Sequence, residues 1–274
     1  MVHAKKSWER AGKMKPLHYT LLGTGSSHGI PSIGCDCSVC TSSEPKNSRR
    51  RCSLYLYCDN THLVVDTPPD FREQVLNYGV SKIDALFITH AHADHIMGFD
   101  DVRRFSHHHT TGLPVYSHPE TLSQMRTKFD YVLKSSYAPN TVPNIQFIPQ
   151  EEPLQIGSLT ITPLPVPHGT MATYGYRVET PHHALAYIPD CQAIPAATLH
   201  LLQDLDLMIL NALRPEPHPN HLTIEQSIAY LKQIRARESL ITHISHNSEH
   251  LALQKKLKPD HIIVPWDGYS GVLK

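Results

Sequence analysis

The sequence predicts an α/β protein built as a β-sandwich with helices on its outer faces. Short apolar runs rich in β-branched and aromatic residues recur along the chain, and amphipathic helical patterns follow several of the later ones. Sheets with one apolar face pack against each other, and helices then cover the outer faces. A length of 274 residues suits one large domain of this kind with a substantial core.

In chain order, the first half opens with a polar tail at residues 1–15 that lacks periodicity. Strands are expected where apolar runs end at turn residues: 17–23, 52–58, 62–66, 84–89 and 114–116. Asp59 and Asn60 indicate a hairpin between the second and third of these strands. Helical patterns cover residues 69–78 and 119–129.

The second half repeats this style, with helices after its later strands. Its expected strands are residues 159–164, 175–179, 184–188, 205–211 and 239–243, and its expected helices are residues 194–203 and 223–235. Residues 135–155 contain four prolines and are expected to form the longest loop. No low-complexity linker divides the chain, so we expect a single domain over residues 16–274.

Charge and cysteine content limit the function classes. The 25 Lys and Arg residues balance 25 Asp and Glu residues, which gives no broad cationic surface for extended nucleic acid and favours a small substrate. Apolar runs are far shorter than the roughly 20 residues that span a bilayer, and no apolar segment follows the charged N-terminus. We therefore expect a cytoplasmic protein without a membrane partner, whose six cysteines are reduced. The oligomeric state stays open, a homodimer included.

Four side chains that can bind a metal lie within six residues, directly after the strand expected at residues 84–89. They are His90, His92, Asp94 and His95. The carboxyl end of a buried strand is where α/β sheets usually carry their sites. Imidazole and carboxylate ligands without a thiolate suit zinc, iron or manganese and favour hydrolytic chemistry. A polar loop that happens to be rich in histidine is the alternative, and it leaves the ligand spacing unexplained.

This H-x-H-x-D-H run resembles the signature of the metallo-β-lactamase superfamily. His168, Asp190 and His243 each follow or end a predicted strand, in the order in which that superfamily places its further ligands. The resemblance implies an αββα sandwich of two mixed β-sheets with helices on the outer faces. It also implies a catalytic centre with two divalent transition metals, either zinc or manganese, with iron as a further option.

The resemblance assigns each of these residues a role. The two implied ligand sets are His90, His92 and His168 for one metal, Asp94, His95 and His243 for the other, and Asp190 for both. Asp94 counts among the catalytic residues as well. Asp66 closes an earlier strand and matches the first motif of the superfamily, where the carboxylate orients metal ligands without touching the metal.

A second cluster combines a C-x-C-x-x-C triplet at Cys35, Cys37 and Cys40 with His246, three residues after His243. Three thiolates and one imidazole complete a tetrahedral structural zinc site, whereas three reduced surface thiols are the alternative. Together with the segments GTGSSHG, RRRCS and LITHISH, this combination resembles the PhnP-type phosphodiesterases of the carbon-phosphorus lyase pathway, which hold such a structural zinc. The remaining cysteines are expected in the core: Cys52, Cys58 and Cys191.

A third element is His221, which directly precedes the helix expected at residues 223–235. PhnP-type enzymes carry a histidine in a similar segment, where it contacts the substrate phosphate and protonates a leaving oxygen. The resemblance assigns both roles to His221. Without the resemblance, the alternative is a histidine at the start of a helix with no functional role. Arg104 is a further candidate for binding substrate charge. The run at residues 107–109 is expected to be a solvated loop.

These assignments predict a dinuclear metal-dependent phosphodiesterase for a small cyclic or nucleotide phosphodiester. Two cations sharing a carboxylate generate a hydroxide that attacks phosphorus, and His221 protonates the departing alkoxide. The alternatives are a ribonuclease Z-like endonuclease, a thioesterase or lactonase, and a non-catalytic metal-binding module. The chain lacks a long basic arm for tRNA, which argues against the endonuclease. A thioesterase or lactonase would leave His221 and the cysteine triplet without a role. A non-catalytic module would leave the intact ligand set without one.

Overall fold

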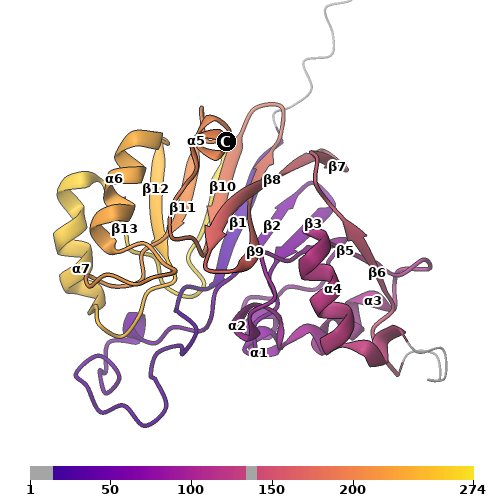
Figure 1. Cartoon of the computed structure of the whole chain (residues 1–274), viewed down its shortest axis with the longest axis horizontal. Coiled ribbons are helices and arrows are strands. Elements are labelled where there is room, and N and C mark those ends of the chain that lie inside the picture. The colour runs from indigo at the N-terminus through magenta and orange to yellow at the C-terminus, as the bar shows by residue number, and fades with distance from the viewer. Residues whose placement is uncertain (1–14, 134–140) are drawn as a thin grey trace, which may run out of the picture.

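The computed structural model describes residues 15–133 and 141–274 as a sandwich of two β-sheets between two layers of helices (Figure 1). The predicted αββα architecture with two mixed sheets is therefore confirmed. The predicted tail at residues 1–15 lies outside the described residues except for Lys15, whose Nζ pairs with Asp59 Oδ2. No helix of the described ranges is long and apolar enough to cross a membrane.

Within the described ranges the first sheet has seven strands in the order β14-β1-β2-β3-β4-β5-β6. They are β1 (Leu17–Gly23), β2 (Ser53–Cys58), β3 (Thr61–Val65), β4 (Ala85–Phe87), β5 (Leu113–Ser117), β6 (Ile145–Pro149) and β14 (Ser270–Leu273). The pairs from β14 to β3 are antiparallel, and those from β3 to β6 are parallel. Because parallel strands end at the same edge, the carboxyl ends of β3 and β4 lie side by side.

The second sheet has the order β13-β12-β11-β10-β9-β8-β7, again for the described part of the chain. Its strands are β7 (Leu154–Ile156), β8 (Leu159–His168), β9 (Met171–Glu179), β10 (Ala184–Ile188), β11 (Leu207–Asn211), β12 (Glu238–Thr242) and β13 (Ile262–Ile263). The strands from β7 to β10 pair antiparallel, and those from β10 to β13 pair parallel. The carboxyl ends of β10 and β12 therefore share one edge.

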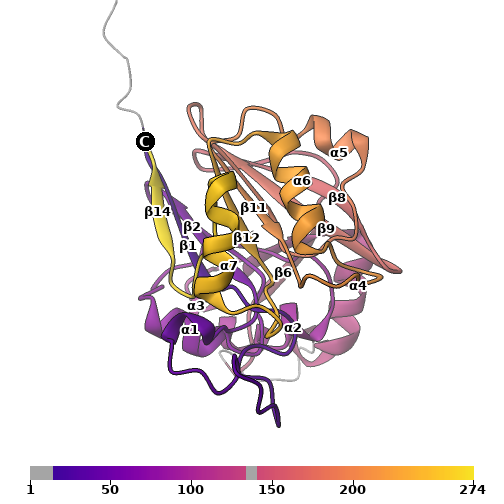
Figure 2. The same cartoon turned by 90° about the vertical axis from the view of Figure 1, so that its left-hand side faces the viewer.

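Helices cover the outer face of each sheet. On the first sheet lie α1 (Phe71–Asn77), α2 (Ala93–Ile96), α3 (Arg103–Ser106) and α4 (Pro119–Lys128). On the second lie α5 (Ala196–His200), α6 (Ile224–Ile234) and α7 (His250–Leu257), seen face-on in Figure 2. Short 3-10 helices complete the described elements: η1 (Pro45–Asn47), η2 (Phe99–Val102), η3 (Asp130–Leu133) and η4 (Lys258–Asp260).

The sequence explains where α6 begins and which face it buries. The Thr223 side chain accepts the Gln226 N–H, and the Gln226 side chain accepts the Thr223 N–H, so two unpaired donors of the first turn are satisfied. Ile224, Ile228 and Leu231 then recur at helical spacing and enter the core between α6 and the second sheet. This cap also fixes the chain that precedes α6, which carries His221.

Residues 135–155 were expected to form a loop, and this expectation is wrong for its described part, which contains β6 and the start of β7. Pro149 ends β6 at the edge of the first sheet, where the missing N–H breaks no ladder. The expected end of β8 at Leu164 is also wrong, because the strand continues through three prolines to His168. Beyond Ile161 this strand pairs only with β9, so Pro163, Pro165 and Pro167 remove no pairing with β7.

Candidate active site

The ends of strands from both sheets deliver the predicted ligands to one place. His90 follows β4, His168 ends β8, Asp190 follows β10 and His243 follows β12. His92 is the N-cap of the short helix α2, so Asp94 and His95 lie in its first turn. All seven predicted ligands therefore meet at the edge where the carboxyl ends of the strands converge.

Three imidazoles form the first group. The Nε2 atoms of His90 and His168 lie 2.9 Å and 3.2 Å from Nδ1 of His92. Burial lowers the pKa of His90 well below its usual value and lowers that of His168 to about 4. Both rings are consequently neutral, which is the form that binds a metal.

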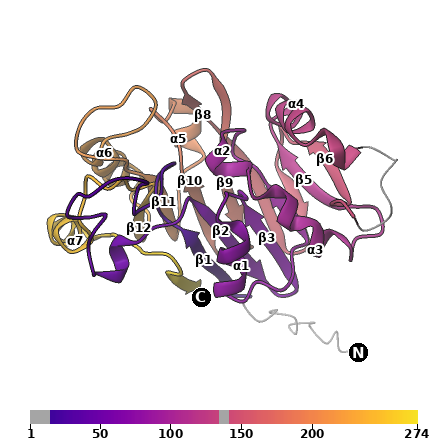
Figure 3. The same cartoon turned by 90° about the horizontal axis from the view of Figure 1, so that it is seen from below.

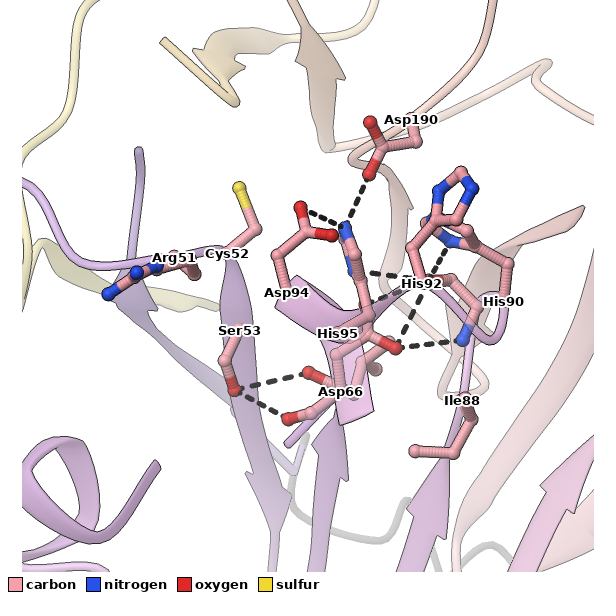
Figure 4. Close-up of polar contacts among 12 residues, drawn as sticks. Arg51, Cys52, Ser53, Asp66, Ile88, His90, His92, Asp94, His95 and Asp190 are labelled. Carbon is pink, nitrogen blue, oxygen red and sulfur yellow. Dashed lines mark hydrogen bonds and ion pairs between the residues drawn. The ribbon is translucent and has the colours of Figure 1, made fainter. Parts of the chain in front are cut away.

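Two carboxylates and two imidazoles form the second group. His95 Nε2 lies 2.7 Å from Asp190 Oδ2 and 3.4 Å from Asp94 Oδ2 (Figure 4). His243 Nε2 lies 3.2 Å from Asp190 Oδ1 and 3.7 Å from Asp94 Oδ2. Burial alone would raise the pKa of either carboxyl, but His95 and His243 outweigh it and hold both pKa values below the usual range. Asp190 thus lies between the two rings as an anion.

The contacts around Asp190 fit a metal better than hydrogen bonding. His95 Nε2, both Asp190 carboxylate oxygens and His243 Nε2 are buried, and none of them makes a hydrogen bond of acceptable geometry despite their short separations. Buried polar atoms are normally paired, so atoms that face one small space without bonding each other suit a shared cation. Nitrogen and oxygen donors in this number fit a divalent transition metal.

Asp66 and Thr89 orient these ligands. Asp66 follows β3, is fully buried, and accepts the Thr89 N–H and the His95 Nδ1–H at 2.8 Å and 2.7 Å. The Thr89 hydroxyl donates to Asp66 and therefore accepts from His90 Nδ1 at 3.0 Å. Both rings are held with Nδ1 protonated and Nε2 free for a metal.

His221 lies beside the Asp190 carboxylate. Its Nδ1 is 2.9 Å from Asp190 Oδ1, and its ring stacks on His243 with centroids 4.7 Å apart. The preceding residue, Asn220, accepts the His168 Nδ1–H through its backbone oxygen at 2.9 Å. One segment thus positions a ligand of the first group and brings a further imidazole to Asp190.

The cysteine triplet forms a separate cluster with His246. The Sγ atoms of Cys35, Cys37 and Cys40 lie 3.3 Å, 3.6 Å and 3.4 Å from His246 Nδ1. The Cys40 N–H, donated to Cys37 Sγ, lowers the pKa of the Cys37 thiol to about 6. The loop that carries the triplet lies against the start of α7, where the His250 N–H donates to Asn47 Oδ1 (Figure 3).

The other cysteines behave as expected. Cys52, Cys58 and Cys191 are almost completely buried, and all six cysteines are free thiols. Their place in the core is therefore confirmed.

Arg104 is not brought to the metal-ligand cluster. It lies exposed on α3 and lines a hollow with Arg72 and Phe105, which contains none of the clustered histidines. Sequence reasoning missed Thr89, although it directly precedes the motif, and Lys128, whose Nζ donates to the Ala91 oxygen between two ligands. Nothing in the sequence near Lys128 signals this contact, because it joins α4 to the segment between β4 and α2.

Comparison with known proteins agrees with this geometry. The family described as "Beta-lactamase superfamily domain" matches residues 61–244. The crystal structure of a new diphosphatase from the PhnP family is similar with a TM-score of 0.85 and 37% identity, covering 94% of this chain and 98% of that one. The chain belongs to the PhnP family of the β-lactamase superfamily. This membership implies divalent metal binding and supports a metal-dependent hydrolase.

Two further proteins are similar to this PhnP-family chain, one in sequence and one in structure. A protein named octanoyltransferase from Porphyromonas gingivalis is 34% identical over 261 residues, which are 92% of this chain but 51% of that protein. The chain thus spans about half the length of this curated relative. Zinc-bound PqqB from Methylobacterium extorquens is 20% identical with a TM-score of 0.80, covers 93% of this chain and all of its own, and shares the fold.

Proposed function

We propose that this chain is a phosphodiesterase that hydrolyses a small phosphodiester, cyclic or nucleotide, with two divalent metals. The observation that carries the proposal is Asp190, whose two oxygens face His95 on one side and His243 and His221 on the other. Similarity to a PhnP-family diphosphatase supports it, because hydrolysis of a diphosphate and hydrolysis of a phosphodiester both break a P–O bond by attack of water on phosphorus.

The ligand assignment follows the two groups. One metal would be held by His90, His92 and His168, the other by Asp94, His95 and His243, with Asp190 shared. Zinc and manganese suit these donors, and iron is also compatible. When bound, the two cations supply an activated water and positive charge for the substrate oxygens.

The protein's own residues hold this arrangement and handle the proton. Asp66 and Thr89 fix the rings of His95 and His90, and the Asn220 oxygen fixes His168. His221 faces Asp190 through Nδ1, which leaves Nε2 for an oxygen of the substrate. From there it binds the phosphate and donates a proton to the departing alkoxide.

A substrate panel tests this function. Metal-replete protein should turn over small phosphodiesters, including 2',3'-cyclic nucleotides and linear dinucleotides, faster than a lactone or an octanoyl thioester. Chelation should abolish the activity, and added zinc or manganese should restore it. The octanoyl thioester tests whether this chain shares the activity in the name of the octanoyltransferase relative. The match covers only 51% of that protein, so its name does not assign acyl chemistry to the matched part. Faster turnover of the thioester would overturn the proposal.

We also propose that Cys35, Cys37, Cys40 and His246 hold a structural zinc. Their four ligand atoms lie close enough to share one ion, and four protein ligands leave no position open for water. The site joins the loop after β1 to the segment after β12. The six free thiols fit the cytoplasmic location that we propose for the enzyme.

Replacement of Cys37 should separate this zinc from the catalytic metals. We expect Cys37→Ser to lose one zinc per chain and to lower the thermal midpoint by about 2 to 4 °C for each kcal/mol of folding free energy that the zinc supplies. Elemental analysis and a thermal melt measure both effects. Ser38→Ala changes an exposed neighbour and should leave both quantities unchanged. Lost turnover in Cys37→Ser with unchanged stability would contradict the structural role.

A further inference from the structure

A hollow between α1 and α3 lies outside the catalytic cluster. It has a volume of about 420 Å³, and its walls come from α1, the segment after α1, and the run from η2 to the end of α3. Its floor is apolar and largely buried, formed by Val75, Val80 and Phe105. Leu76 at its side is 63% exposed. This size and lining are typical of small-molecule sites.

Two arginines, Arg72 and Arg104, lie on the rim of this hollow. Within the described part of the chain, the guanidinium groups of Arg72 and Arg104 make no hydrogen bond and no ion pair within 4 Å, whereas Arg51 nearby pairs with Asp70 at 2.9 Å. Asp101 also lines the hollow, so its rim holds two guanidinium groups against one carboxylate. The rim therefore has excess positive charge above an apolar floor.

A second hollow continues the first. It has a volume of about 450 Å³, is lined by Lys82, Ile83 and His109 among others, and shares Ser81, Phe105 and His108 with the first. Lys82 and Asp84 on its side pair with each other at 3.0 Å and so add no free charge. The two hollows form one groove, and Arg72 and Arg104, which make no hydrogen bond or ion pair with the described residues, lie at one end of it.

We propose that this groove binds a small amphipathic acid, with an aliphatic tail along its floor and a carboxylate between Arg72 and Arg104. A guanidinium group binds a carboxylate with two parallel hydrogen bonds, which neither arginine makes with the described residues. The tail covers the exposed side chain of Leu76 and lies against Val75 and Phe105 at the floor. Arg104, expected from the sequence to bind substrate charge, thereby binds a different anion in a site of its own.

Binding of decanoate to the metal-replete protein tests this site. Calorimetry, at concentrations below micelle formation, should show saturable binding with one molecule per chain. Affinity should rise from butyrate to decanoate as the tail fills the groove, and decyltrimethylammonium, with the same tail and the opposite charge, should not bind.

Three variants locate the acid. Arg72→Gln and Arg104→Gln should each weaken decanoate binding by about tenfold or more, because each removes a charge-assisted pair. Leu76→Gln should weaken it less, and more for decanoate than for hexanoate. The matched control is Arg103→Gln, since Arg103 lies next to Arg104 but donates to the Thr141 oxygen and does not line the groove. All four residues are exposed, so the variants should fold.

Three results would overturn the proposal: no saturable binding at any tail length, equal binding of the cation, or equal losses in Arg103→Gln and Arg104→Gln. None of them bears on phosphodiester hydrolysis, which the substrate panel decides separately.

Discussion

Asp190→Asn should abolish hydrolysis and reduce the content of catalytic metal. The substitution keeps the size of the side chain but removes the negative charge that faces His95 and His243. As the shared ligand that we propose, Asp190 would help to hold both metals, whose charge would supply several kcal/mol of transition-state stabilisation, so kcat/KM should fall by about 10³-fold or more. Steady-state kinetics and elemental analysis after metal reconstitution measure the two effects together.

The matched control for Asp190 is Asp206. This carboxylate precedes β11, pairs with Arg237 at 2.8 Å and accepts the Ala184 N–H at 3.0 Å, away from the clustered ligands. Asp206→Asn should therefore retain full metal content and turnover. If Asp190→Asn kept both metals and wild-type activity, Asp190 would not be a shared ligand.

His221→Ala should leave both catalytic metals bound and slow the chemical step. Seven other side chains form the ligand sets that we propose, and His221 faces Asp190 without belonging to either set. A general acid contributes about 10² to 10⁴-fold to the rate, so kcat on an alkyl phosphodiester should fall by this factor. A p-nitrophenyl diester has a leaving group that needs little protonation, and its hydrolysis should fall much less.

The comparison of the two substrates decides what His221 does. Equal losses on both diesters would assign His221 to phosphate binding instead of proton donation. Loss of a metal would make it a ligand, which its closeness to His168 and Asp190 allows. The control is His182→Ala, an exposed imidazole before β10, which should change neither substrate.

The sequence predicted most of the sheet strands because their apolar runs are local. It also placed His90, His168, Asp190 and His243 at strand ends, and the structure has each of them there. It failed where a residue's effect depends on its neighbours in the sheet. Prolines were interpreted as a loop at residues 135–155, whereas Pro149 sits in an edge strand that tolerates them.

The sequence by itself determined which side chains stand at strand ends and that a cysteine triplet exists, since strand boundaries and ligand spacing are properties of adjacent residues. Only the tertiary structure decided which of them meet. Asp66 reaches His95 because β3 and β4 are parallel neighbours, and His221 reaches Asp190 because the capped start of α6 lies beside the end of β10. Arg104 follows His95 by only nine residues in the chain, yet it lines a different hollow together with Arg72 and Val75 of α1. Distances through space follow from strand pairing and helix packing, which no local pattern contains.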